Sequence, residues 1–227
     1  MSIDKIKEKV FTGRRLTRKD GLELFKSNDL LMLGRMAEQV AQHKNGNRVY
    51  FVRNMHINPT NICVNRCKFC AFSRSKGEPG AYEMSIEDIL EKARGAGKGI
   101  RELHIVSGLH PDLPFAWYLD MLRALKKEFP KIHLKAFTAV EIDYLSKISG
   151  FNLKETLLKL REAGLGSLPG GGAEIFNASV RNTLCAEKIS GERWLAVIKA
   201  AHKIGLKSNA TMLYGHCLLY TSPSPRD

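Results

Sequence analysis

The sequence lacks any long apolar run. No stretch approaches the ~20 apolar residues that a membrane-spanning helix needs, so no membrane partner is expected. The first residues, Met1 to Lys5, also lack the basic-then-apolar layout of a secretion signal. We therefore expect a cytoplasmic protein.

Cysteine is scarce, and its count is odd. The 227 residues include 5 cysteines, of which three are clustered and two stand alone. In a chain without a secretion signal, an odd and clustered count argues against a disulfide framework and favours metal binding. The cysteines are Cys63, Cys67, Cys70, Cys185 and Cys217.

Acidic residues are few relative to basic ones. The chain has 36 Lys and Arg against 23 Asp and Glu, which gives a formal charge of +13. Such a surplus favours anionic partners, either a small carboxylate or a nucleic acid. We find no basic block interleaved with aromatic residues, so we expect no nucleic-acid partner. A basic RNA-binding protein with a metal-supported fold remains the alternative of another class.

The N-terminal residues 1–48 are predicted to form a helical extension. Thr17 and Asp20 match a capping box at the start of one helix. A second helix is expected from about Asp29, because apolar residues recur there at helical spacing. Asn45 and the following Gly are expected to end it.

From residue 49 the apolar period changes to that of buried strands. One strand is expected over 49–57, and further strands start near 103, 133, 165 and 206, with a helix in each gap. This alternation is typical of a parallel α/β sheet or barrel, in which functional loops follow the C-terminal ends of the strands. We predict a (β/α) barrel core over 49–216 that is incomplete at its C-terminus. Residues 217–227, which end in Ser-Pro-Ser-Pro-Arg-Asp, are expected to be a non-native tail on a truncated chain.

Three cysteines carry the strongest chemical signal. Cys63, Cys67 and Cys70 have the spacing C-x3-C-x2-C, directly after the first expected strand. Three thiolates on one loop can each bind one iron of a [4Fe–4S] cluster and leave the fourth iron open for a ligand. A structural zinc site is a competing interpretation, but it usually draws four ligands. A ferredoxin-like cluster would need Cys185 or Cys217 as the fourth ligand.

The cysteine motif, with Phe69 just before its last Cys, resembles that of the radical S-adenosylmethionine (SAM) superfamily. The resemblance implies a barrel, a [4Fe–4S] cluster at the three cysteines, and SAM bound to the open iron. It also implies a reducing electron donor of the flavodoxin or ferredoxin type and homolytic cleavage of SAM to a 5′-deoxyadenosyl radical. Phe69 would lie near the adenine.

A narrower resemblance covers residues 17–216 almost continuously. Five segments together resemble the aminofutalosine synthases: His56–Cys63, Ser107–Pro111, Lys135–Ile142, Leu168–Phe176 and Ser208–His216. This family implies addition of the radical to 3-[(1-carboxyvinyl)oxy]benzoate, a small anionic aromatic substrate, to form 6-amino-6-deoxyfutalosine in menaquinone biosynthesis. Cyclic dehypoxanthinylfutalosine synthase and FO-synthase-like enzymes remain the alternatives within the superfamily.

The resemblance also suggests roles for residues that follow the second and third strands. Ser107 and Gly108 correspond to the place where the SAM amino group is held, and a glycine there allows close backbone approach. Glu141 could accept the ribose hydroxyls of SAM, although a surface salt bridge is nearly as plausible.

Three further residues are candidates for contact with the substrate. His110 could bind a carboxylate or carry a proton, or it could be an ordinary loop histidine. Glu174, beside the Gly170–Gly172 run, could be an acid, a base or a ribose ligand. Arg181 could clamp a carboxylate with its planar guanidinium, or it could be a solvated surface residue.

Overall fold

The computed structural model describes residues 3–215. Contacts divide the chain into two compact units, Met1–Phe51 and Val52–Asp227. The predicted tail over 217–227 lies outside the described residues. None of the described helices is long and apolar enough to cross a membrane.

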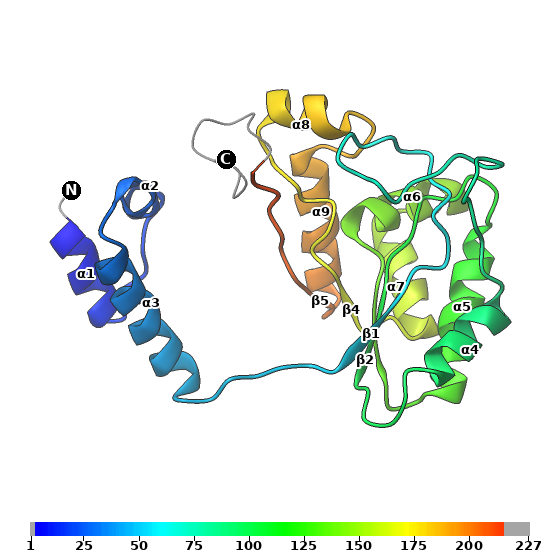
Figure 1. Cartoon of the computed structure of the whole chain (residues 1–227), viewed down its shortest axis with the longest axis horizontal. Coiled ribbons are helices and arrows are strands. Elements are labelled where there is room, and N and C mark those ends of the chain that lie inside the picture. The colour runs from blue at the N-terminus through cyan, green and yellow to red at the C-terminus, as the bar shows by residue number, and fades with distance from the viewer. Residues whose placement is uncertain (1–2, 216–227) are drawn as a thin grey trace. The chain divides into compact units, whose positions relative to one another are not determined.

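The first unit consists of helices, shown in blue in Figure 1: α1 (Ile3–Phe11), α2 (Arg18–Lys26) and α3 (Leu30–Asn45). The predicted capping box forms at α2, where the Thr17 hydroxyl accepts a hydrogen bond from the Asp20 amide. The buried Asp20 carboxylate also pairs with Lys9 at 2.8 Å. Hydrogen bonds from Lys9, and then from Thr17, lower its pKa to about 2. This ion pair joins α1 to the start of α2.

The second unit is built on a parallel sheet in which the spatial order β1-β2-β3-β4-β5 follows the chain order. Its strands are β1 (Asn54–Ile57), β2 (Glu102–Ile105), β3 (His133–Ala136), β4 (Ser167–Leu168) and β5 (Lys207–Ser208). The predicted parallel α/β fold is confirmed, and the sheet does not close, as expected of an incomplete barrel. Consecutive parallel strands place all their C-terminal ends, and the loops that follow them, at one edge of the sheet.

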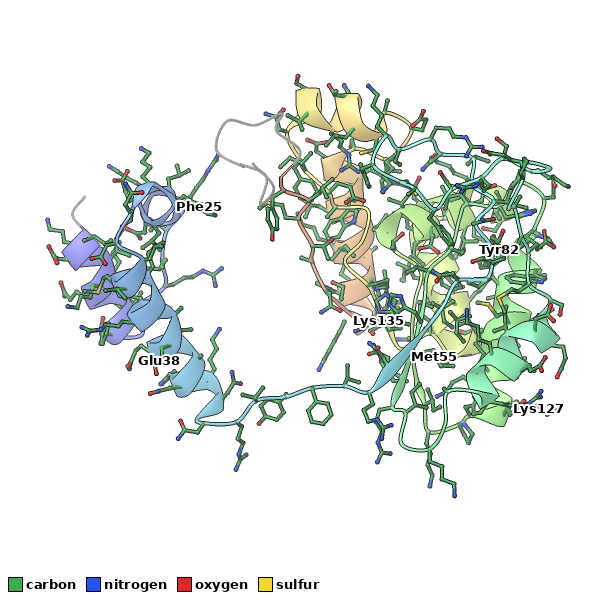
Figure 2. The ribbon with its side chains drawn as sticks, in the orientation of Figure 1. Phe25, Glu38, Met55, Tyr82, Lys127 and Lys135 are labelled. Atoms are coloured by element: carbon green, nitrogen blue, oxygen red, sulfur yellow. The ribbon has the colours of Figure 1, made fainter. Side chains whose placement is uncertain are left out.

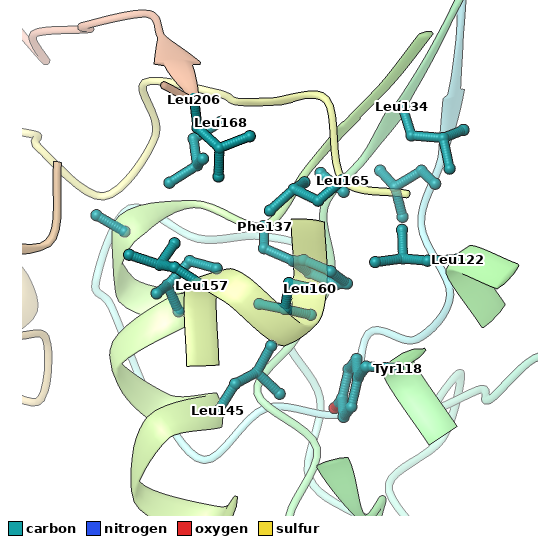
Figure 3. Close-up of a cluster of buried hydrophobic side chains, with 14 of the residues drawn as sticks. Tyr118, Leu122, Leu134, Phe137, Leu145, Leu157, Leu160, Leu165, Leu168 and Leu206 are labelled. Atoms are coloured by element: carbon teal, nitrogen blue, oxygen red, sulfur yellow. The ribbon is translucent and has the colours of Figure 1, made fainter. Parts of the chain in front are cut away.

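The described part of this unit, residues 52–215, contains six helices: α4 (Ile86–Arg94), α5 (Phe115–Glu128), α6 (Ala139–Ser149), α7 (Leu153–Ala163), α8 (Ala178–Cys185) and α9 (Gly191–Lys203). Capping boxes start α4, α6 and α7. One apolar core packs these helices, α8 excepted, against one face of the sheet (Figure 3). Leu103 and Ile105 of β2 and Leu134 of β3 supply that face and are fully or almost fully buried.

Two predicted strands are shorter than expected. Residues 49–53 have no strand pairing, and β1 begins only at Asn54. The apolar side chains of Val49, Tyr50 and Phe51 are largely exposed, so this run does not enter the core. The last strand, expected over 206–213, is confined to Lys207–Ser208, because its partner β4 is itself only two residues long.

Candidate metal and cofactor site

The cysteine loop connects β1 to α4 and is held by one internal hydrogen bond and by two other segments of the chain. The Cys63 amide donates to the Arg74 carbonyl at 3.1 Å, within the loop itself. The Val64 amide donates to the Leu109 carbonyl at 3.0 Å, and the Lys68 amide donates to the Leu184 carbonyl at 2.9 Å. The segment after β2 and the end of α8 therefore fix the loop.

Gly108 allows the segment after β2 to approach this loop. Its amide donates to the Thr60 carbonyl at 2.9 Å. A Cβ atom added at Gly108 would lie 2.2 Å from the Ile62 carbonyl oxygen, which is far inside van der Waals contact. The backbone approach that the structure shows at Gly108 is to the cysteine loop, and the expected contact with the SAM amino group stays a prediction.

A pocket at the C-terminal ends of β1, β2 and β3 brings the predicted cofactor residues together. Its wall includes all three clustered cysteines and the four residues predicted to bind cofactor: Cys63, Cys67, Cys70, Phe69, Ser107, Gly108 and Glu141. The metal and cofactor candidates thus share one cavity at the edge of the sheet where the barrel argument placed them. Their individual roles stay predictions.

The three thiols differ in environment. Burial raises the pKa of Cys67 to about 11. Burial also acts to raise the pKa of Cys70, but hydrogen bonds from the Ser73 and Phe72 amides outweigh it, and the pKa is lowered. The positive charge of Lys188 lowers the pKa of both thiols.

The donor set suits a cluster better than a single ion. Among residues 3–215, no three His, Cys, Asp or Glu side chains converge in the way that one metal ion requires. A cubane cluster needs no such convergence, because each thiolate binds a different iron. Three thiols line one pocket, on a loop held by the Leu109 and Leu184 carbonyls, so each thiol can bind a different iron.

Glu141 is buried and links two of the segments that form the pocket. One carboxylate oxygen accepts from the Thr138 amide at 2.7 Å, closing the capping box of α6. The other accepts from the Ser107 amide at 3.0 Å. Burial raises the pKa of Glu141 to about 7, against the lowering effect of these hydrogen bonds. The alternative of a surface salt bridge is wrong, because the carboxylate is inside and bound to amides.

Lys188 is a pocket residue that the sequence did not single out. Its ammonium lies 5.1 Å from the centre of the Phe69 ring, within range of a cation–π contact. The same ammonium pairs with Glu174. Glu174 itself does not line the pocket, and its backbone has a positive φ of 48°. Lys188 lies within residues 17–216, which the family resemblance covers, but a single lysine gave no separate signal in the sequence.

His110 is buried outside the pocket wall. Its Nδ1 accepts from the amides of Asp112 at 3.1 Å and Leu113 at 3.2 Å. Its Nε2 lies 2.7 Å from a Glu83 carboxylate oxygen, but the contact does not meet the geometry of a hydrogen bond. The structure therefore shows His110 organising its own loop and does not bring it to the other candidates.

Arg181 is buried on α8, and the predicted surface alternative is wrong. Its guanidinium donates to the carbonyls of Gly172 at 2.9 Å, Ala173 at 2.6 Å and Ile175 at 3.2 Å. Two more bonds, at 2.9 and 2.5 Å, reach the carbonyl of Ile189. All five donor hydrogens of an arginine are thereby matched, so none is left for a substrate carboxylate. The predicted clamp is corrected to a support for the loops on either side of α8.

Of the two isolated cysteines, Cys185 is buried and packs against Cys67 in a small apolar cluster with Val180 and Leu184. Burial raises its pKa, which suits an inert thiol. Cys217 lies outside the described residues.

Comparisons with known proteins agree with this geometry. The Radical SAM superfamily matches residues 57–218. The chain is 45% identical over 212 residues to an aminodeoxyfutalosine synthase of Thermus thermophilus and 46% identical to one of Streptomyces coelicolor. These alignments cover 93% of this chain but only 57% and 55% of the relatives, so the chain spans little more than half of their length.

Relatives named for another activity are nearly as similar. A 5-amino-6-(D-ribitylamino)uracil–L-tyrosine 4-hydroxyphenyl transferase of Methanopyrus kandleri is 42% identical over 80% of this chain and 48% of its own. Among solved structures, methylornithine synthase superposes with a TM-score of 0.68 at 22% identity, covering 92% of this chain and 59% of that one. The FeFe-hydrogenase maturase HydG of Carboxydothermus hydrogenoformans gives 0.70 at 19% identity, covering 93% and 48%. The two structures share the fold, and with the superfamily match they show that this chain belongs to the radical SAM superfamily.

Proposed function

We propose that this chain is the cluster-bearing part of a radical SAM enzyme that joins the 5′-deoxyadenosyl group of SAM to 3-[(1-carboxyvinyl)oxy]benzoate, forming 6-amino-6-deoxyfutalosine. The observation that supports it best is the single pocket containing Cys63, Cys67 and Cys70 together with Phe69 and Ser107. The 45–46% identity to aminodeoxyfutalosine synthases favours this reaction over others of the superfamily.

A bound [4Fe–4S] cluster would supply the electron that cleaves SAM. A reducing donor of the flavodoxin or ferredoxin type would pass that electron to the cluster. Cys63, Cys67 and Cys70 would hold the cluster. The chain's own contribution is positioning, through a loop fixed by the Leu109 and Leu184 carbonyls. A cytoplasmic setting, where thiols stay reduced, suits such a site.

Neighbouring residues would orient SAM beside that loop. Phe69 offers an aromatic ring on which adenine can stack, and the cation–π contact with Lys188 would hold that ring in place. The Ser107 amide and hydroxyl both donate to Glu141, at 3.0 and 3.4 Å, so the backbone carbonyl of Ser107 is the group we expect to meet the amino-acid part of SAM.

The second candidate is the tyrosine-dependent 4-hydroxyphenyl transfer of the Methanopyrus relative, favoured by 42% identity. The two reactions use different second substrates, a benzoate enol ether in one case and L-tyrosine with an aminouracil in the other. Product masses distinguish them directly.

The first experiment tests the cluster. The whole chain is reconstituted anaerobically with iron and sulfide, and we expect the broad visible absorbance of an iron–sulfur cluster, followed by SAM cleavage on reduction. Cys67→Ala should abolish both, whereas Cys185→Ala should retain them. Equal iron and sulfide retention by wild type and Cys67→Ala, or SAM cleavage without a cluster, would contradict the proposal. Incubation with each set of second substrates then assigns the reaction by product mass.

A further inference from the structure

The face of the sheet opposite the apolar core carries an unassigned row of polar side chains. The strand register aligns one residue from each strand across the whole sheet: His56, His104, Lys135, Ser167 and Lys207. Side chains alternate between the two faces of a strand. Since Ile57, Ile105 and Ala136 point into the core, this polar row points the other way.

Contacts connect members of the polar row to one another and to Glu102 and His133, which lie on the same face of the sheet. The rings of His56 and His104 lie 4.3 Å apart between centres. The Lys135 ammonium pairs with Glu102 at 3.1 Å, and both side chains are largely buried. Two residues before Lys135 on β3, and on the same face of the sheet, His133 Nε2 lies 2.7 Å from the Ser167 hydroxyl. In Figure 2, Lys135 lies beside the strands, on the side away from the helices α4 and α5.

This composition is unusual for the inner face of a parallel barrel. Such interiors are filled mainly by Val, Ile and Leu in packed layers. Burying a lysine and a glutamate costs free energy that their mutual attraction only partly repays. A polar row in this position is therefore better explained by a ligand than by packing.

The polar row lies directly below the candidate cofactor pocket. Asn58 and Val106 follow His56 and His104 by two residues, directly after the ends of β1 and β2, and both line that pocket. Two residues of strand span roughly 6.6 Å, about the length of one aromatic ring. A small aromatic molecule with one end at the cysteine loop can thus reach the polar row with its other end.

We infer that this polar row binds the carboxylate of a small aromatic substrate whose reacting end lies in the cofactor pocket. The inference rests on the proposed function and adds the place where the substrate is recognised. Lys135 has three donor hydrogens and gives one to Glu102, so donors remain for an anion, and the two imidazoles supply more.

Charge and protonation at His104 favour an anion over a cation. His104 faces His56 from β1, Lys135 from β3 and Glu102 on its own strand. Burial, and then the two basic neighbours, lower its pKa, so the ring is neutral at neutral pH. A bound carboxylate raises that pKa again, and binding therefore takes up a proton. Affinity for the anion should weaken as pH rises.

The test titrates the whole chain, reconstituted anaerobically, with 3-hydroxybenzoate, the unreactive aromatic part of the proposed substrate. Lys135→Met alone would leave Glu102 buried and unpaired, so the main variant is Lys135→Met with Glu102→Gln. We expect at least a tenfold loss of affinity in this double variant and in His104→Leu. Lys127→Met, which removes a positive charge from the outer surface of α5, should change affinity less than twofold.

The outcomes separate this inference from the proposed function. Wild-type binding that weakens in the two row variants, and with rising pH, supports the polar row even if no cluster assembles, in which case only the proposed function fails. Equal affinity in wild type and both row variants, or no binding by a wild type that holds a cluster and cleaves SAM, overturns the inference. Circular dichroism on each variant confirms that the fold is retained.

Discussion

Replacing Arg181 by Met should destabilise the second unit rather than weaken substrate binding. The guanidinium is 4% exposed and donates to four backbone carbonyls. Methionine fills most of the space but donates no hydrogen bond. Each buried carbonyl left unpaired costs ~1 kcal/mol at the lower end of the usual range, so we expect a loss of about 4 kcal/mol in the free energy of unfolding. Because a domain is stable by only ~5–15 kcal/mol, that loss is easily measured.

Lysine at the same position provides the matched comparison. It keeps the positive charge but offers three donors without the planar fork, so Arg181→Lys should recover about half of the loss. Urea unfolding followed by tryptophan fluorescence measures both variants. Trp194 is a suitable reporter, because its indole N–H donates to the Gly171 carbonyl at 3.1 Å, beside the loops that Arg181 supports.

One result would refute this reasoning. If Arg181→Met unfolds within about 1 kcal/mol of wild type and instead loses affinity for 3-hydroxybenzoate, the arginine is a carboxylate clamp after all. An unchanged affinity in a protein that is still folded, together with the lower stability, supports the structural role.

Two more predictions concern the pocket wall. Gly108→Ala should displace the cysteine loop, because the new Cβ would lie 2.2 Å from the Ile62 carbonyl oxygen. The reconstituted variant should therefore retain less iron and sulfide than wild type after desalting. Gly34→Ala, in a helix with nothing within 4 Å of the new atom, should retain a normal amount and gain up to ~1 kcal/mol of stability. Glu141 has a pKa raised from 4.5 to about 7, so the folded state favours its protonated form and loses stability as pH rises through 7. Between about pH 5 and about pH 8 that loss should reach about 3 kcal/mol, and Glu141→Gln should flatten it; equal pH profiles for the two proteins would contradict the assignment.

The sequence correctly predicted those helices and loops whose local sequence motifs agree with the burial seen in the structure. The capping pair Thr17 and Asp20 located the start of α2, and the cysteine spacing located the pocket loop. Helix α6 was missed because it has no clean apolar stripe: its polar residues Glu141 and Asp143 are as buried as its apolar ones. Helix α1 was missed because it is short and highly charged.

Burial and hydrogen bonding decided the roles that the sequence left open. A histidine after a strand can face a ligand or its own loop, and only the bonds to the Asp112 and Leu113 amides show that His110 does the latter. Conversely, the polar row became apparent only from the register between strands. In the sequence, His56, His104 and Lys135 are separated by dozens of residues and share no local pattern.

The strand order has a consequence for how the protein is made. Because β1 to β5 neighbour one another in chain order, each strand emerging from the ribosome can pair with the one already present. The cysteine loop is an exception, since it is synthesised before the Gly108 and Leu109 backbone that holds it. The Leu184 carbonyl of α8, which also holds the loop, is made later still. The three thiols therefore lie on an incompletely supported loop until both β2 and α8 have docked, and iron–sulfur insertion into an ordered site has to wait for both events.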